Sequence, residues 1–156
     1  MSMDYFTVKW IHILSSTLLL GTGLGIAFFM WMAHRTRDAR AIATTARMVV
    51  IADSVFTAPA VAIQLVTGLW MVHALHMPFG TFWVEMSLIL FFVTGACWLP
   101  VVWLQIRARD LARQAVVAGD PLPTVYGRVM RWWFWLGWPA FISVIVIFWL
   151  MVHKPG

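Results

Sequence analysis

The hydrophobic positions of this chain fall into four long segments, and only one or two polar groups interrupt each of them. A helix needs about 20 residues to cross the hydrocarbon core of a bilayer, and every segment is at least that long. We therefore predict an all-α fold, a four-helix transmembrane bundle with up-down topology. The predicted helices span residues 5–32, 48–77, 82–107 and 131–153.

Capping signals predict that two of these helices continue beyond the apolar segments. Asp38 is placed to cap a helix that runs into the second segment, and the third segment can extend past Arg107 until Gly119. The remaining connections are short, so consecutive helices should be antiparallel neighbours. Residues 1–156 are therefore interpreted as a single integral membrane domain.

The positive charges gather in two connections, which indicates how the helices are oriented. The connection between the second and third segments has no Lys or Arg. By the positive-inside rule the Arg-rich connections are cytoplasmic and both termini lie outside. We expect a multi-pass protein of the bacterial inner (cytoplasmic) membrane. The arginines are Arg35, Arg37, Arg40 and Arg47 in the first connection and Arg107, Arg109, Arg113, Arg128 and Arg131 in the last.

Composition excludes soluble folds and narrows the partners. Hydrophobic residues make up 62% of the chain, charged residues only 11%, and there are eleven tryptophans. The net charge of +5 could suggest a nucleic acid, but the basic residues are grouped by membrane side rather than along one binding face. The predicted partner is the lipid bilayer, with no nucleic acid. Cys97 is the only cysteine, so no intramolecular disulfide can form, and a packing role is expected for it.

Polar groups inside the apolar segments are the functional candidates, because such groups are expensive in a bilayer. On the second segment, Asp53, Thr57, Gln64 and Gly68 recur at spacings of four, seven and four, which places them on one helical stripe. We expect this stripe to face the bundle interior. Asp53 either pairs with Arg47 or takes part in proton transfer, and the sequence leaves both interpretations open.

The histidines point to a haem or a metal, because neutral imidazole is a common ligand of haem iron and a four-helix bundle can hold a haem between facing helices. His12 lies two residues after Trp10, inside the apolar layer, and His73 lies three residues after Trp70. We predict His12 as an axial ligand and His73 as the second one. A shared haem requires tilt or a helix offset between them.

Two charged residues at the same depth as His12 are the catalytic candidates. Glu85 lies two residues after Trp83 and is predicted to accept a proton. Lys9 is one turn from His12 on the same helical face, and it either reaches toward Glu85 or extends outward to the interface. Gly21 and Gly25 form a small-xxx-small face that would let a neighbouring helix or a flat cofactor approach the backbone.

Short motifs in three of the four segments resemble one known family. They are Lys9-x-x-His12-Ile13 in the first segment, Thr57-Ala58-Pro59-Ala60 and Thr67-Gly68-Leu69-Trp70 in the second, and Arg131-Trp132, Pro139 and Lys154-Pro155 in the last. The family is HemJ, the membrane protoporphyrinogen oxidases. The chain also looks like an uncharacterised bacterial family of predicted four-helix integral membrane proteins related to HemJ and to CopD-like membrane domains.

The resemblance implies haem b, with His12 at the position of the family's helix 1 histidine. The chain departs from the HemJ pattern at Glu85, where that pattern has a lysine, and at Leu136-Gly137, where it has Asn-Glu. These departures argue against porphyrinogen oxidation and leave the haem site in place.

The sequence supports three functional hypotheses. The first is a haem b-binding membrane oxidoreductase that acts on a quinol-like or porphyrin-like substrate near the outer surface, with Gln64, Gly21 and Gly25 beside the cofactor. The second is a copper-handling or transport protein of the CopD type, since ten methionines could offer soft ligands to copper. The third is a non-enzymatic accessory subunit. A homo-oligomer is left open.

Overall fold

The computed structural model describes residues 4–155, and every regular element among them is helical. Four helices are long and apolar enough to cross a membrane. They are α1 (Tyr5–Thr36), a second span made of α2 (Ala39–Ala52), η1 (Asp53–Thr57) and α3 (Ala58–Ala74), then α4 (Phe82–Ala118) and α5 (Thr124–His153). The all-α, four-helix fold predicted from hydropathy is confirmed.

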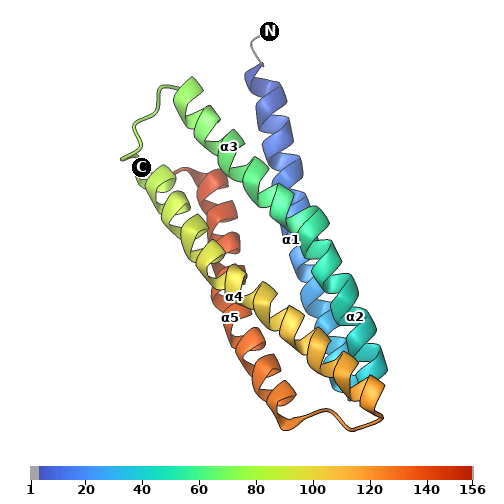
Figure 1. Ribbon diagram of the computed structural model, residues 1–156. Helices are drawn as coiled ribbons and strands as arrows, with labels where there is room; N and C mark the ends of the chain where they lie inside the picture. The colour runs from blue at the N-terminus through green and yellow to red at the C-terminus, as the bar shows by residue number, and fades with distance from the viewer. Residues whose placement is uncertain (1–3, 156) are drawn as a thin grey trace.

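The two ends of the bundle differ in what they carry. The start of α1 and the end of α5 lie at one end together with the loop between α3 and α4, and the two Arg-rich connections lie at the other (Figure 1). We call these the terminal end and the basic end. This arrangement is the predicted up-down topology, and the assignment of the basic end to the cytoplasm remains a prediction.

The helices begin and end where the caps predicted, outside the apolar segments. The Asp38 carboxylate accepts hydrogen bonds from the backbone N–H groups of Arg40 and Ala41 and so starts α2. Gly119 ends α4 in the left-handed region at φ 72°. The apolar segments were shorter than the helices because hydropathy falls at the arginines, whereas the backbone hydrogen bonds continue past them.

The second span changes neighbours along its length. Near the basic end, α2 packs against both α1 and α4, whereas α3 packs against α1 toward the terminal end. Helices α4 and α5 pack against each other. One pair is α1 with the second span, and the other is α4 with α5. The two pairs therefore meet at the basic end and diverge toward the terminal end (Figure 1).

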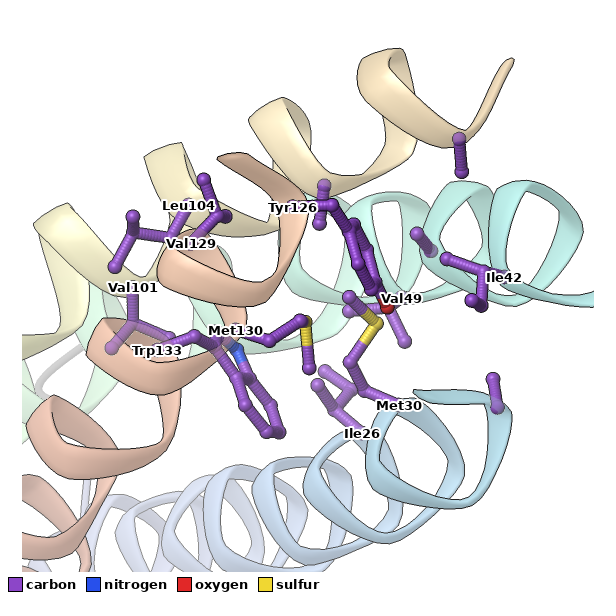
Figure 2. Close-up of a cluster of buried hydrophobic side chains, with 14 residues drawn as sticks. Ile26, Met30, Ile42, Val49, Val101, Leu104, Tyr126, Val129, Met130 and Trp133 are labelled. Atoms are coloured by element: carbon purple, nitrogen blue, oxygen red, sulfur yellow. The ribbon is translucent and has the colours of Figure 1, made fainter. Parts of the chain in front are cut away.

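The principal core lies at the basic end, where all four spans contribute side chains (Figure 2). Met30 and Ile42 are 0% exposed, and small residues on the facing helices let the backbones approach. These small residues are Ala33, Ala46, Ala108 and Ala112. Trp133 lies beside Met130 at the edge of this core (Figure 2).

The π-helical turn η1 precedes Pro59 and accommodates it. A proline in a regular α-helix lacks the N–H for the usual bond, and its ring clashes with the carbonyl four residues earlier. Here the chain widens before the proline, and the Ala58 N–H donates to the Asp53 carbonyl, five residues back. A π-helical turn holds roughly one residue more than an α-helical turn, so it rotates α3 by about 100° relative to α2.

Candidate functional site

A continuous chain of hydrogen bonds joins α1 to α3 around His12. The Gln64 amide nitrogen lies 2.8 Å from His12 Nε2, and Thr67 Oγ1 lies 2.8 Å from His12 Nδ1. The Ser15 hydroxyl donates to Gln64 Oε1, and the Thr67 hydroxyl donates to the Ile63 carbonyl. We call Ser15, Gln64, His12 and Thr67 the histidine chain.

The directions of these bonds indicate which ring nitrogen of His12 carries a proton. Because Gln64 Oε1 accepts from Ser15, the amide nitrogen is left to donate to His12 Nε2. Because the Thr67 hydroxyl donates to the Ile63 carbonyl, its oxygen accepts the proton on His12 Nδ1. The Ser15 hydroxyl also lies 3.0 Å from the His12 carbonyl. With Gln64 Oε1 turned toward Ser15, the network fits a neutral histidine with both ring nitrogens engaged.

A glycine makes room for the His12 ring, although it is not one of the two that the sequence singled out for close approach. A Cβ added at Gly68 would lie 3.3 Å from His12 Cε1. A Cβ added at Gly21 or Gly25 would meet nothing within 4 Å among the described residues. Close helix packing at Gly21 and Gly25 is therefore not found within residues 4–155, and the small residue beside His12 of α1 lies on α3.

A partly enclosed cavity of about 440 Å³ lies inside the bundle and is lined by side chains of all four spans. Its walls are mostly aliphatic and aromatic, and Gly23, Gly95 and Gly137 also line it. A cavity of this size falls within the range of about 300–1,000 Å³ that holds small organic ligands. We call it the central cavity.

Several polar side chains line the central cavity, and we call five of them the polar wall. It consists of Asp53 and Thr57 on η1, Trp98 and Gln105 on α4, and Trp133 on α5. Asp53 is only 4% exposed and Gln105 only 2%. The Trp98 indole N–H donates to Asp53 Oδ1 at 3.3 Å.

Four buried atoms of the polar wall have no hydrogen-bond partner among residues 4–155. They are Asp53 Oδ2, Thr57 Oγ1, Gln105 Oε1 and Trp133 Nε1. Leaving a buried polar group unpaired costs about 1–3 kcal/mol, and such groups are few in native proteins. Four such atoms on residues that line one cavity favour a site for a polar group, which these side chains would reach by small rotations toward the cavity.

The predicted polar stripe of the second span does face protein, but it serves two neighbours. Asp53 bonds to Trp98 on α4, whereas Gln64 bonds to His12 and Ser15 on α1. The rotation in η1 separates the two halves of the stripe. Gln64 also lines the central cavity, so the histidine chain and the polar wall share that cavity.

The remaining predicted contacts are not made within the described residues. Asp53 has no salt bridge to Arg47, because the only one in this range joins Arg109 to Asp110. Lys9 and Glu85 are exposed and form no salt bridge with each other in the same range. His73 is exposed near the end of α3. The catalytic roles predicted for Lys9 and Glu85, and the haem ligation predicted for His73, stay predictions.

Sequence reasoning missed most of the polar wall and half of the histidine chain. Gln105 lies just before the arginines of α4, a position that is typical of the membrane surface. Trp98 and Trp133 have the pattern of interfacial or packing residues. Ser15 and Thr67 are common in membrane helices, where they bond to their own backbone. Only the pairing across helices distinguishes these residues.

Comparison with known proteins places the chain in a family without assigning an activity. No curated protein and no solved structure matches it. The family described as "Predicted integral membrane protein (DUF2269)" matches residues 6–155. That description names no cofactor, so the relationship to HemJ or CopD stays a prediction. The match covers nearly the whole chain, which therefore belongs to this family of predicted integral membrane proteins.

Proposed function

We propose that this protein binds a quinol-like or quinone-like ring compound in the central cavity. The observation that carries the proposal is the set of four unpaired polar atoms on residues that line a mostly apolar cavity. A buried polar group without a partner is explained by a ligand or by ordered water. The apolar and aromatic remainder of the wall favours an organic ligand.

The unpaired atoms match a ligand that both donates and accepts. Asp53 Oδ2 and Gln105 Oε1 are acceptors, and Trp133 Nε1 is a donor. A quinol hydroxyl can donate to either acceptor, and a quinone carbonyl can accept from the Trp133 indole. An alkyl chain would leave all of these atoms unpaired, and a metal cation would not satisfy the indole N–H.

The location within the bilayer suits a lipid-soluble ligand. The cavity is lined by four tryptophans and by phenylalanines, whose rings stack against a flat ring at little cost in conformational entropy. The tryptophans are Trp31, Trp98, Trp133 and Trp138. In this arrangement the Asp53 carboxylate binds and orients a ring hydroxyl and is positioned to accept its proton.

Equilibrium binding to the purified full-length protein in lipid nanodiscs tests the proposal. Quenching of tryptophan fluorescence would be followed with a short-chain benzoquinol and with an alkylbenzene of the same size that lacks ring oxygens. We expect the quinol to bind at least about tenfold more tightly, because only the quinol satisfies the polar wall. Equal affinity for the alkylbenzene would show that the cavity binds apolar rings without a specific polar site.

Haem b at His12 is our second proposal, and a specific contact favours it. Histidines that ligate metals usually donate their other ring N–H to a fixed partner, as His12 Nδ1 does to Thr67. The central cavity itself does not fit haem ligation, because no His, Cys, Met or Tyr side chain lines it. A haem on His12 would require Gln64 to release Nε2. Within residues 4–155 no group of three or more His, Cys, Asp or Glu side chains could hold a metal ion.

A reduced visible absorption spectrum of the purified protein tests this second proposal. With haem present, His12→Ala should remove or shift the bands, whereas His76→Ala, which changes an exposed histidine in the α3–α4 loop, should not. Gln64→Ala is expected to raise haem uptake, because it frees Nε2. A haem spectrum unchanged by His12→Ala would exclude His12 as a ligand.

A further inference from the structure

A second cavity, of about 670 Å³, lies at the basic end between α1, the α4–α5 loop and the start of α5. We call it the basic cavity. Arg37, His34 and Arg131 line it, and no acidic residue does. Neither arginine takes part in a salt bridge within residues 4–155. The cavity therefore presents positive charge that the described protein does not neutralise.

The histidine of this cavity is held in a fixed orientation. His34 Nδ1 lies 3.3 Å from the Tyr126 hydroxyl, and the imidazole packs against the rings of both Tyr126 and Trp31. No hydrogen bond of His34 Nε2 is found among the described residues. A fixed ring with one free nitrogen, in a cavity that two arginines also line, is suited to binding the oxygens of an anion.

Part of the lining of the basic cavity is apolar, and two of these apolar residues also line the central cavity. Trp31 and Phe134 line both cavities, and their rings are in contact, with centroids 5.1 Å apart. Leu122 and Met130 also line the basic cavity. A cavity lined by both basic groups and apolar side chains matches an anionic amphiphile better than a fully hydrated anion.

We propose that the basic cavity binds the phosphate group of an anionic phospholipid, with Arg37, Arg131 and His34 as its ligands. Guanidinium groups bind phosphate oxygens through paired hydrogen bonds, and basic pockets between transmembrane helices are suited to phospholipid headgroups. The apolar side chains that line the cavity would contact the glycerol and the upper acyl chains of the phospholipid. This site is independent of the quinol proposal, because none of its ligands lines the central cavity.

Native mass spectrometry of the detergent-purified full chain, incubated with equal amounts of phosphatidylglycerol and phosphatidylcholine, tests the proposal. The wild type should retain phosphatidylglycerol preferentially. The double variant Arg37→Gln/Arg131→Gln should lose on the order of 30-fold of that preference, since both guanidinium groups that would bind the phosphate oxygens are removed. The matched control is Arg40→Gln/Arg113→Gln, which removes the same charge from two exposed arginines that do not line the cavity. This control should keep the preference.

Equal losses in both double variants would overturn the proposal, because they would reflect the charge of the basic end and not a site. Absence of any preference in the wild type would overturn it as well. Thermal unfolding with inorganic phosphate, at matched ionic strength, separates the two sources of phosphate. A stabilisation that Arg37→Gln/Arg131→Gln abolishes would support the phosphate site and extend it to soluble phosphate, whereas retention of phosphatidylglycerol alone would support the lipid headgroup.

Discussion

Replacing Gly95 with leucine is expected to abolish quinol binding while the bundle still folds. Gly95 lines the central cavity, and a Cβ built there meets nothing within 4 Å among the described residues. The new side chain can therefore occupy the space that the ligand would take. Leucine is also a better helix former than glycine by about 0.5–1 kcal/mol, so folding should not suffer. Titration in nanodiscs should show affinity reduced by at least about tenfold, the equivalent of 1.4 kcal/mol.

Gly21→Leu is the matched control for this variant. Gly21 is exposed, does not line the cavity, and likewise has no neighbour within 4 Å of an added Cβ. Both substitutions gain the same helix propensity, so a difference between them reports on the cavity alone. Unchanged quinol affinity in Gly95→Leu would mean that the ligand binds elsewhere.

Replacing Asp53 with asparagine should make the ligand-free protein more stable and invert its ligand preference. Thr57 and Gln105 lie beside the Asp53 carboxyl, and Asp53 Oδ2 and Gln105 Oε1 are both unpaired acceptors. An amide nitrogen in place of Oδ2 can donate to Gln105 Oε1 or to Thr57 Oγ1, which should stabilise the fold by about 1 kcal/mol. The same nitrogen no longer accepts from a quinol hydroxyl but can donate to a quinone carbonyl.

Thermal unfolding in detergent and paired titrations with quinol and quinone would measure both effects. We expect quinol affinity to fall at least about tenfold, while quinone affinity holds or rises. Asp110→Asn is the control, because that carboxylate is 40% exposed and pairs with Arg109 outside the cavity. It should change stability by no more than about 0.5 kcal/mol. A loss of stability in Asp53→Asn with unchanged quinol binding would assign Asp53 a structural role.

The fold was predictable because a bilayer allows few solutions. Four apolar segments of sufficient length had to become four helices, since backbone groups in hydrocarbon must bond within their own segment. The caps at Asp38 and Gly119 depend only on local chemistry and were also readable. Hydropathy underestimated the helix lengths, because a helix need not end where the hydrocarbon ends.

The candidate site was predictable only in part, and η1 shows why. The spacings of four, seven and four from Asp53 to Gly68 imply one stripe only if the helix keeps a constant 3.6 residues per turn. The π-helical turn before Pro59 breaks that assumption. Asp53 and Gln64 were correctly expected to face protein, but their separate partners on α4 and α1 could not be read from periodicity.

The partners of these two residues were hidden for a different reason. Trp98, Gln105 and Trp133 are ordinary residues for a membrane helix, and their significance arises from what lies opposite them. His12 was recognised as unusual, and its neighbour Gly68 was recognised as part of the stripe, but neither pattern predicted that the two would be in contact. Such contacts between helices depend on rotation and tilt, which the amino-acid pattern of one helix does not specify.

The π-helical turn η1 also makes the second span sensitive to the deletion of a single residue. A substitution near Asp53–Thr57 changes one side chain, whereas deletion of one residue there would remove the extra residue of the π-helical turn and turn α3 by about 100° about its axis. Every side chain from Ala58 to Ala74 would then point in a new direction, and Gln64 and Gly68 would leave the face that meets His12. A single missing codon in this stretch would thus do more harm to the interior than most missense changes around it.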